Sequence, residues 1–154
     1  MNQYLEDFSA GQVLTGAQTW TVTADDIKTF AAQFDPQPFH LDEAAAKASI
    51  FRGLAASGWH TAAMTMKLLV QSDFRPVGGI VGAGAEEFSW PRPTRPGDVL
   101  RVQCEVLETK PSAKNPRQGM LRARLTTLNQ SSEPVQIALM KVIVPCRPAD
   151  QAQR

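Results

Sequence analysis

The chain has 154 residues, a length that suits one domain with a hydrophobic core of its own. Hydrophobic residues make up 43% of the chain and charged residues 20%, which is typical of a globular protein. The 16 basic and 15 acidic side chains nearly cancel, so the charge balance gives no reason to expect a nucleic-acid partner. Two cysteines and two histidines are too few for a structural zinc site, and we expect no metal.

The chain ends and the apolar runs bear on where the protein works. The N-terminal segment lacks the basic start and apolar stretch of a signal peptide, and no apolar run is long enough to span a bilayer. We therefore expect a cytoplasmic protein with no membrane partner and with Cys104 and Cys146 reduced. A single domain is expected over 1–154, with a flexible polar tail at about 148–154.

The first half of the chain is predicted to be one strand followed by three helices, at 17–23, 23–34, 42–51 and 57–72. Thr23 supplies a capping side chain at the start of the first helix, and Pro36 ends that helix. The last helix carries Lys67 as its one charged residue, so we expect it to be buried over much of its circumference.

The second half is predicted to be four strands, at 80–90, 98–109, 119–130 and 134–144. Apolar residues alternate along two of them, which places one set of side chains on one face: Leu100, Val102, Cys104 and Val106, and then Leu121, Ala123 and Leu125. The segments between the strands are rich in turn-forming residues. The order of elements predicts an α+β domain, in which an antiparallel sheet packs against one long helix.

The stretch 35-DPQPFH-40 contains residues suited to proton transfer. Asp35 and His40 can act as an acid and base pair, and the two prolines between them restrict the backbone that carries both. Gln37 has an amide that does not titrate, so we interpret it as a hydrogen-bonding residue that fixes the loop. An Asp-Pro turn also occurs for purely structural reasons, and it is the histidine and the flanking helix that favour a site.

The start of the last predicted helix offers a second functional group. The backbone N–H of Gly58 is one of the unpaired donors of a helix N-terminus, where the helix dipole favours negative charge. A glycine also lets a ligand carbonyl approach the backbone closely. We interpret Ser57 as a helix cap, because the sequence around it lacks the pattern of a nucleophilic serine.

The segments 35-DPQPFH-40 and 54-LAASGWHT-61 together resemble the MaoC-type dehydratases, also called (R)-specific enoyl-CoA hydratases. The resemblance implies the hotdog fold, in which an antiparallel sheet wraps around a long central helix, and a homodimer. It implies reversible hydration of a trans-2-enoyl thioester to the (R)-3-hydroxyacyl thioester, carried by CoA or acyl carrier protein, without a cofactor. Asp35 and His40 would be catalytic and Gly58 would bind the thioester carbonyl, with Gln37 and Ser57 supporting them. The family usually has asparagine where this chain has Gln37.

The loop 110-KPSAKNPRQ-118 has two open interpretations. Lys110, Lys114 and Arg117 would attract the phosphates of CoA if the loop lay near the site. An ordinary solvated hairpin loop has the same composition.

Two other functions compete with hydration. Hotdog thioesterases commonly carry a carboxylate on or near the central helix, and 58–72 contains neither Asp nor Glu. A non-catalytic acyl-binding or dimerisation module is the other alternative, and the intact Asp35 and His40 pair argues against it.

Overall fold

The computed structural model describes residues 2–149. Most of the predicted C-terminal tail therefore lies outside the described residues, and the extent of the domain over 1–154 stays a prediction. The elements in chain order are η1 (Leu5–Asp7), β1 (Val13–Thr15), β2 (Trp20–Thr21), α1 (Ala24–Phe34), α2 (Pro38–Leu41), α3 (Glu43–Lys47), α4 (Gly58–Val70), β3 (Val81–Ser89), β4 (Val99–Pro111), β5 (Gln118–Leu128) and β6 (Pro134–Pro145).

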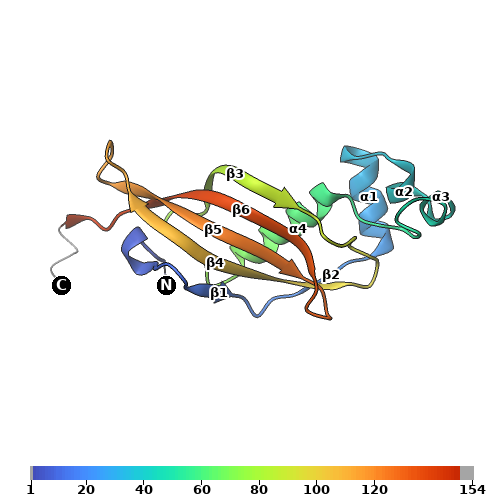
Figure 1. Ribbon diagram of the computed structural model, residues 1–154, viewed down its shortest axis with the longest axis horizontal. Helices are drawn as coiled ribbons and strands as arrows, with labels where there is room; N and C mark the ends of the chain where they lie inside the picture. Colours follow the sequence, from blue (N-terminus) through green and yellow to red (C-terminus); the bar gives the residue numbers. More distant parts are fainter. Residues whose placement is uncertain (1, 150–154) are drawn as a thin grey trace.

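The strands form one antiparallel sheet in the order β1-β4-β5-β6-β3, and β2 also pairs with β4. Helix α4 lies across one face of this sheet, and α1, α2 and α3 gather beyond one end of it (Figure 1). The turn between β4 and β5 lies at the opposite end. The α+β class and the wrapping of the sheet around one long helix are confirmed.

Alternating residues of β4 and β5 build the covered face of the sheet. All seven apolar residues predicted for that face are buried: Leu100, Val102, Cys104, Val106, Leu121, Ala123 and Leu125. Arg124, between two of them, points the other way and bonds Glu105 of the neighbouring strand at 2.6 Å. The period of two therefore predicted both faces correctly, because adjacent residues of a strand point to opposite sides.

Helix α1 begins where its capping residue predicts. The Thr23 hydroxyl oxygen accepts a hydrogen bond from the Asp26 N–H at 3.1 Å. Ile27 and Ala31, one turn apart, have no exposed surface. The helix predicted at 42–51 is shorter in the structure, where α3 ends at Lys47, and α2 before it was not predicted. Asp42 caps α3 through the Ala45 N–H at 2.7 Å.

The N-terminal strands differ most from the sequence prediction. The strand predicted at 17–23 is reduced to Trp20–Thr21, and β1 at Val13–Thr15 was not predicted. Both are short segments that pair with β4, as in the register Leu14↔Cys104. Their position is set by the neighbouring strand rather than by their own sequence pattern, so local propensity does not locate them.

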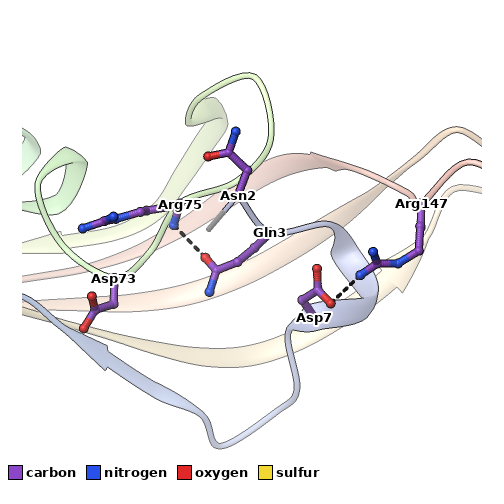
Figure 2. Close-up of a pocket in the computed structure, with 6 residues that line it drawn as sticks. All are labelled: Asn2, Gln3, Asp7, Asp73, Arg75 and Arg147. Atoms are coloured by element: carbon purple, nitrogen blue, oxygen red, sulfur yellow. Dashed lines mark hydrogen bonds and ion pairs between the residues drawn. The ribbon is translucent and has the colours of Figure 1, made fainter. Parts of the chain in front are cut away.

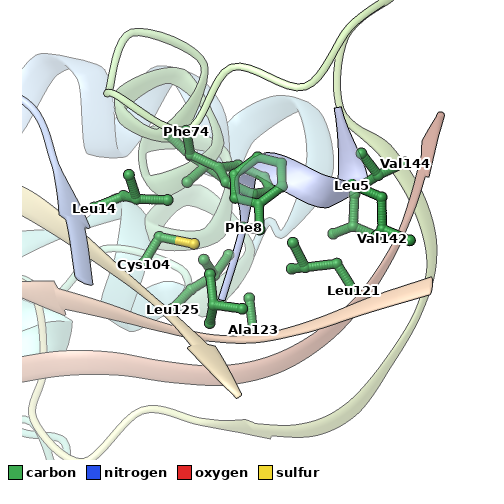
Figure 3. Packing of buried hydrophobic residues seen from close by; sticks show 12 residues of the cluster. Leu5, Phe8, Leu14, Phe74, Cys104, Leu121, Ala123, Leu125, Val142 and Val144 are labelled. Carbon is green, nitrogen blue, oxygen red and sulfur yellow. The ribbon is translucent and has the colours of Figure 1, made fainter. Parts of the chain in front are cut away.

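The core has two parts. One cluster, drawn in Figure 3, joins the N-terminal segment to the sheet and includes Phe8, Phe74 and Leu121. The other joins the helical end to the sheet through ten buried residues: Val22, Ile27, Ala46, Leu54, Ala56, Met64, Leu68, Leu100, Val102 and Val135. Because this second cluster contains residues of α1, α3, α4 and β4, it fixes the helices that carry the polar stretch 35–40.

Both cysteines are thiols, as predicted. Burial raises the pKa of the Cys104 thiol to about 12, which makes it unreactive at neutral pH. None of the helices within residues 2–149 has the length and apolarity that crossing a membrane would need.

Candidate active site

Asp35 and His40 lie against each other at the junction of α1 and α2. Asp35 is the C-terminal cap of α1, and His40 lies in the single turn of α2. The carboxylate Oδ2 of Asp35 is 3.3 Å from Nε2 of His40. The His40 side chain is 6% exposed and that of Asp35 is 17% exposed, so the pair is shielded but reachable. Pro38, at the first position of α2, presets the backbone angle there.

The proton on the His40 ring is placed by a backbone carbonyl. Nδ1 of His40 is 2.6 Å from the carbonyl oxygen of Ala55, which can only accept a hydrogen bond. Nδ1 therefore carries a hydrogen, and in the neutral form of the ring an unprotonated Nε2 faces Asp35. Two acceptors then face each other across 3.3 Å. A water molecule donating one hydrogen to each would satisfy both groups.

Asp35 is held in its charged form. Burial would raise its pKa, but the Ser57 side chain, the hydrogen bond from Gln37 and the charge of His40 in its protonated form outweigh burial and lower that pKa below its usual value. The Gln37 amide donates to Oδ1 of Asp35 at 2.6 Å, leaving Oδ2 for His40. Gln37 therefore lies beside Asp35, and its supporting role in catalysis stays a prediction.

Ser57 has two functions at the start of α4. Its hydroxyl oxygen caps the helix by accepting a hydrogen bond from the Trp59 N–H at 3.2 Å, as predicted. The same side chain lies close enough to the carboxylate of Asp35 to help lower its pKa. Gly58 follows as the first residue of α4, where its N–H has no acceptor within the helix. The N-terminus of α4 thus lies beside the Asp35 and His40 pair.

A cavity of about 320 Å³ brings Gln37, His40 and Gly58 to one surface. Its walls come from α2, the α3–α4 connection, the first turns of α4 and the segment after β3. The lining residues are Gln37, Phe39, His40, Phe51, Ala56, Gly58, Thr61, Trp90, Arg92, Pro93 and Thr94. The lining is mostly apolar with a few convergent polar groups, as in small-molecule sites generally.

The basic loop does not join this cavity within one chain. Lys110, Lys114 and Arg117 lie around the β4–β5 turn, at the end of the sheet away from α1–α3 (Figure 1). Strand β4 is 13 residues long, so it extends over roughly 40 Å at ~3.3 Å per residue. The structure therefore brings together Asp35, Gln37, His40, Ser57 and Gly58 and leaves the loop cations apart.

A second cavity, of about 400 Å³, lies near the N-terminus and is drawn in Figure 2. Three of the charged groups that line it are already engaged: Arg147 pairs with Asp7 at 2.6 Å, and the Arg75 Nε donates to the Ser72 carbonyl oxygen at 2.9 Å. We interpret it as a structural contact, in which the N-terminal segment and Arg147 meet the α4–β3 connection. Across residues 2–149, no group of three or more His, Cys, Asp and Glu side chains is arranged to hold a metal ion.

Sequence reasoning missed two residues that shape the active-site cavity. Trp90 contributes an indole to its wall. Arg95 binds the backbone of the α3–α4 connection, donating to the carbonyl oxygens of Gly53 at 2.8 Å and Leu54 at 3.2 Å and also to that of Phe51. The turn-rich segment 91-PRPTRPGD-98 gave no signal that separates Arg95 from its neighbours.

Comparison with known proteins places these features in a family. Residues 7–128 match the family model described as a MaoC like domain. The uncharacterized protein YdeM of Bacillus subtilis is 34% identical over 140 residues, which are 91% of this chain and 97% of that protein.

Solved structures share the fold over nearly the whole chain. A MaoC-like dehydratase from Rhodospirillum rubrum is 52% identical, with a TM-score of 0.91 over 96% of this chain and 99% of that one. The (R)-hydratase PhaJ1 from Pseudomonas aeruginosa is 26% identical, with a TM-score of 0.72 over 95% of this chain and 88% of that one.

Proposed function

This chain belongs to the MaoC-like dehydratase family, and we propose that it catalyses the reversible hydration of trans-2-enoyl-CoA to (R)-3-hydroxyacyl-CoA. The observation that carries the proposal is the Asp35 and His40 pair, 3.3 Å apart, in which His40 lines a cavity that is also lined by Gly58 at the N-terminus of α4. An (R)-hydratase among the structural relatives supports the stereochemistry of the product.

The hydration needs a water molecule whose proton is removed as its oxygen attacks. A water bound between Nε2 of His40 and Oδ2 of Asp35 would donate a hydrogen to each. Its oxygen forms the bond to the β-carbon of the enoyl group, one of its protons passes to the dyad, and the α-carbon takes up one proton. The pair handles these transfers as one coupled unit, and the dehydration runs the same steps in reverse.

Negative charge develops on the thioester oxygen during the attack. The Gly58 N–H at the start of α4 supplies a donor for that oxygen, in a region where the helix dipole favours negative charge. The donor and the dyad are held near each other, because Ser57 caps α4 and His40 bonds the carbonyl oxygen of Ala55 just before that cap. This pre-organisation favours the transition state over the bound substrate.

We propose that the working form is a homodimer. Strand β3 is the edge of the sheet, paired only with β6, and nearly all of its residues are exposed. Beside it, α4 exposes apolar side chains: Trp59 is 62% exposed, Met66 41% and Val70 60%. An unprotected edge strand next to an apolar helix face is suited to pairing with a second copy.

The dimer also gives the basic loop a function. A two-fold axis that pairs β3 with its copy in antiparallel fashion places the β4–β5 turn of one copy at the α1–α3 end of the other. Lys110, Lys114 and Arg117 of one copy would then approach the CoA phosphates bound by its partner. The loop cations are therefore proposed as contacts made across the dimer.

The test is loss of the enoyl-thioester absorbance when the purified protein is mixed with crotonyl-CoA, followed by chiral analysis of the product. We expect (R)-3-hydroxybutyryl-CoA, and reappearance of the absorbance when that product is supplied as substrate. Release of free CoA thiol instead of hydration would identify a thioesterase. Binding without either reaction would identify a non-catalytic acyl-binding module. Light scattering on the same preparation should give the mass of a dimer.

A further inference from the structure

The indole of Trp90 lies directly on the first residue of α4. A Cβ added to Gly58 would be 2.5 Å from Cε2 of Trp90 and under 3.0 Å from two further ring atoms. No side chain fits in that space, so the contact requires glycine at position 58 independently of any ligand. Trp90 and Gly58 thus form one continuous piece of the active-site wall, in the same cavity as His40.

A buried hydrogen-bond network holds the indole in this position. The Trp90 Nε1–H donates to Oε1 of Gln136 at 3.0 Å, and Gln136 on β6 is only 2% exposed. The Gln136 amide donates in turn to the Thr65 hydroxyl at 3.2 Å, and that hydroxyl is 2.6 Å from the hydroxyl of Thr127 on β5. A buried glutamine is costly unless its groups are bonded, so this network specifies one orientation of the ring.

The side chains next to the indole are aromatic: the ring centroids of Trp59 and Phe88 lie 5.5 Å and 5.1 Å from that of Trp90. Trp59 of α4 contacts Phe88 of β3 with ring centroids 6.0 Å apart, so aromatic side chains bridge the helix and the edge strand there. Further along the same two elements, Met66, Leu69 and Ile80 line a small apolar cavity of about 40 Å³. Trp90 therefore lies between the polar end of the active-site cavity and an apolar seam between α4 and β3.

We propose that Trp90, fixed by Gln136, limits the length of the acyl chain that the site accepts. The proposal rests on the hydratase function proposed above. A rigid ring at this position blocks an acyl tail from entering the α4–β3 seam, so the wild-type protein should favour short enoyl groups. Removing the ring should open the seam, and releasing the ring from Gln136 should open it in part.

The experiment measures kcat/KM for crotonyl-, hexenoyl- and octenoyl-CoA. Trp90→Ala should raise the octenoyl-to-crotonyl ratio about tenfold or more, since discrimination by one apolar pocket contact is about 10–200-fold. Gln136→Met keeps the volume but removes the acceptor for the indole, and should move the ratio the same way by a smaller factor. Trp90→Phe should also raise it. The matched control is Trp20→Phe, a substitution of the same kind at a tryptophan outside the cavity, which should leave the ratio unchanged.

The outcomes separate the two proposals. If the wild type hydrates crotonyl-CoA and the ratio is the same in all variants, or if every chain length loses activity equally, Trp90 is only a structural residue. If the wild type hydrates none of the three substrates, the hydratase function is wrong and this inference falls with it. Circular dichroism of each variant is recorded first, and if Trp90→Ala does not fold, Gln136→Met and Trp90→Phe decide the question.

Discussion

Nδ1 of His40 and the carbonyl oxygen of Ala55 are 2.6 Å apart, and this hydrogen bond joins α2 to the segment that leads into α4. It orients the ring and leaves Nε2 as the nitrogen that faces Asp35. The active-site pair is thus positioned by a backbone group, so its geometry depends on the path of the chain through residues 53–57.

The dyad predicts large losses from single substitutions. Asp35→Asn keeps the size of the side chain but cannot take a proton, and His40→Ala removes the ring that faces the water. Each should lower kcat by about 10²–10⁴-fold with a normal circular dichroism spectrum. Because both groups act on one water, the double variant should be little worse than the worse single variant. Asp25→Asn, at an exposed acid in the first turn of α1, is the matched control and should keep full activity. Near-normal turnover in Asp35→Asn would exclude the dyad.

The hydrogen bond from Gln37 predicts a shift in the pH profile. Hydrogen bonds hold the pKa of Asp35 below its usual value, so removing the Gln37 amide with Gln37→Ala should raise that pKa. The carboxylate is the active form, and the acid limb of kcat/KM should therefore move to higher pH. Gln37→Asn keeps an amide and should restore the wild-type profile at least in part. An acid limb at the same pH in all three proteins would show that the amide does not act on Asp35.

The hydrogen bond from Gln37 to Asp35 should also stabilise the folded state, and this contribution should depend on pH. A carboxyl whose pKa is lower in the folded chain than in the unfolded chain stabilises the fold at a pH above the unfolded pKa, which is about 3.8. That contribution disappears as the pH falls through the folded pKa. The difference in unfolding free energy between wild type and Gln37→Ala should therefore shrink on acidification.

The basic loop predicts a change in substrate affinity. Reversing the charges of Lys114 and Arg117 to Glu should raise KM for crotonyl-CoA and leave kcat nearly unchanged, as expected for lost uniform binding. Crotonyl-pantetheine lacks the nucleotide phosphates, so its KM should not respond. Reversing two cations elsewhere, Lys28 and Arg101, is the control for net charge. If the loop variant has the same kinetic constants as the wild type with both substrates, the loop is ordinary solvated surface.

We expect the stability of the fold to depend on pH through His60, independently of catalysis. Its ring stacks on Phe30 of α1 with centroids 4.7 Å apart, and its Nδ1 is buried without a hydrogen-bond partner. Burial lowers the pKa of His60 below its unfolded value of about 6.5, although the charge of Asp26 partly opposes this. The unfolded chain therefore binds the proton more readily, and stability should fall as the pH drops below about 6.5.

The check is the melting temperature between about pH 8 and about pH 5. His60→Phe keeps a ring against Phe30 and removes the titrating group, so its melting temperature should fall less over this range than that of the wild type. Parallel curves for the two proteins would rule out this contribution.

Much of the fold could be predicted because its signals are local. Thr23 caps α1, Pro36 ends it, and the alternation along β4 and β5 marks their buried face. The proximity of Asp35 to His40 was also predictable, because only four residues, two of them prolines, separate them. The approach of Ser57 to Asp35 was not, since it brings together residues that are 22 positions apart in the sequence.

The remaining features depend on contacts between distant segments. Trp90 meets Gly58 across 32 positions and Gln136 across 46, and neither pairing leaves a pattern in the sequence. The β4–β5 loop has a composition suited to phosphate binding, but its place at the far end of a long strand follows only from the pairing of the sheet.

Arg95 has a consequence for motion. Its guanidinium ties the segment after β3 to three carbonyl groups of the α3–α4 connection, and these two loops frame the active-site cavity. Neither loop can swing outward without breaking several charge-assisted hydrogen bonds at once. We therefore expect the entrance to the cavity to be rigid and permanently open. Substrate should enter and product should leave without these loops closing during turnover.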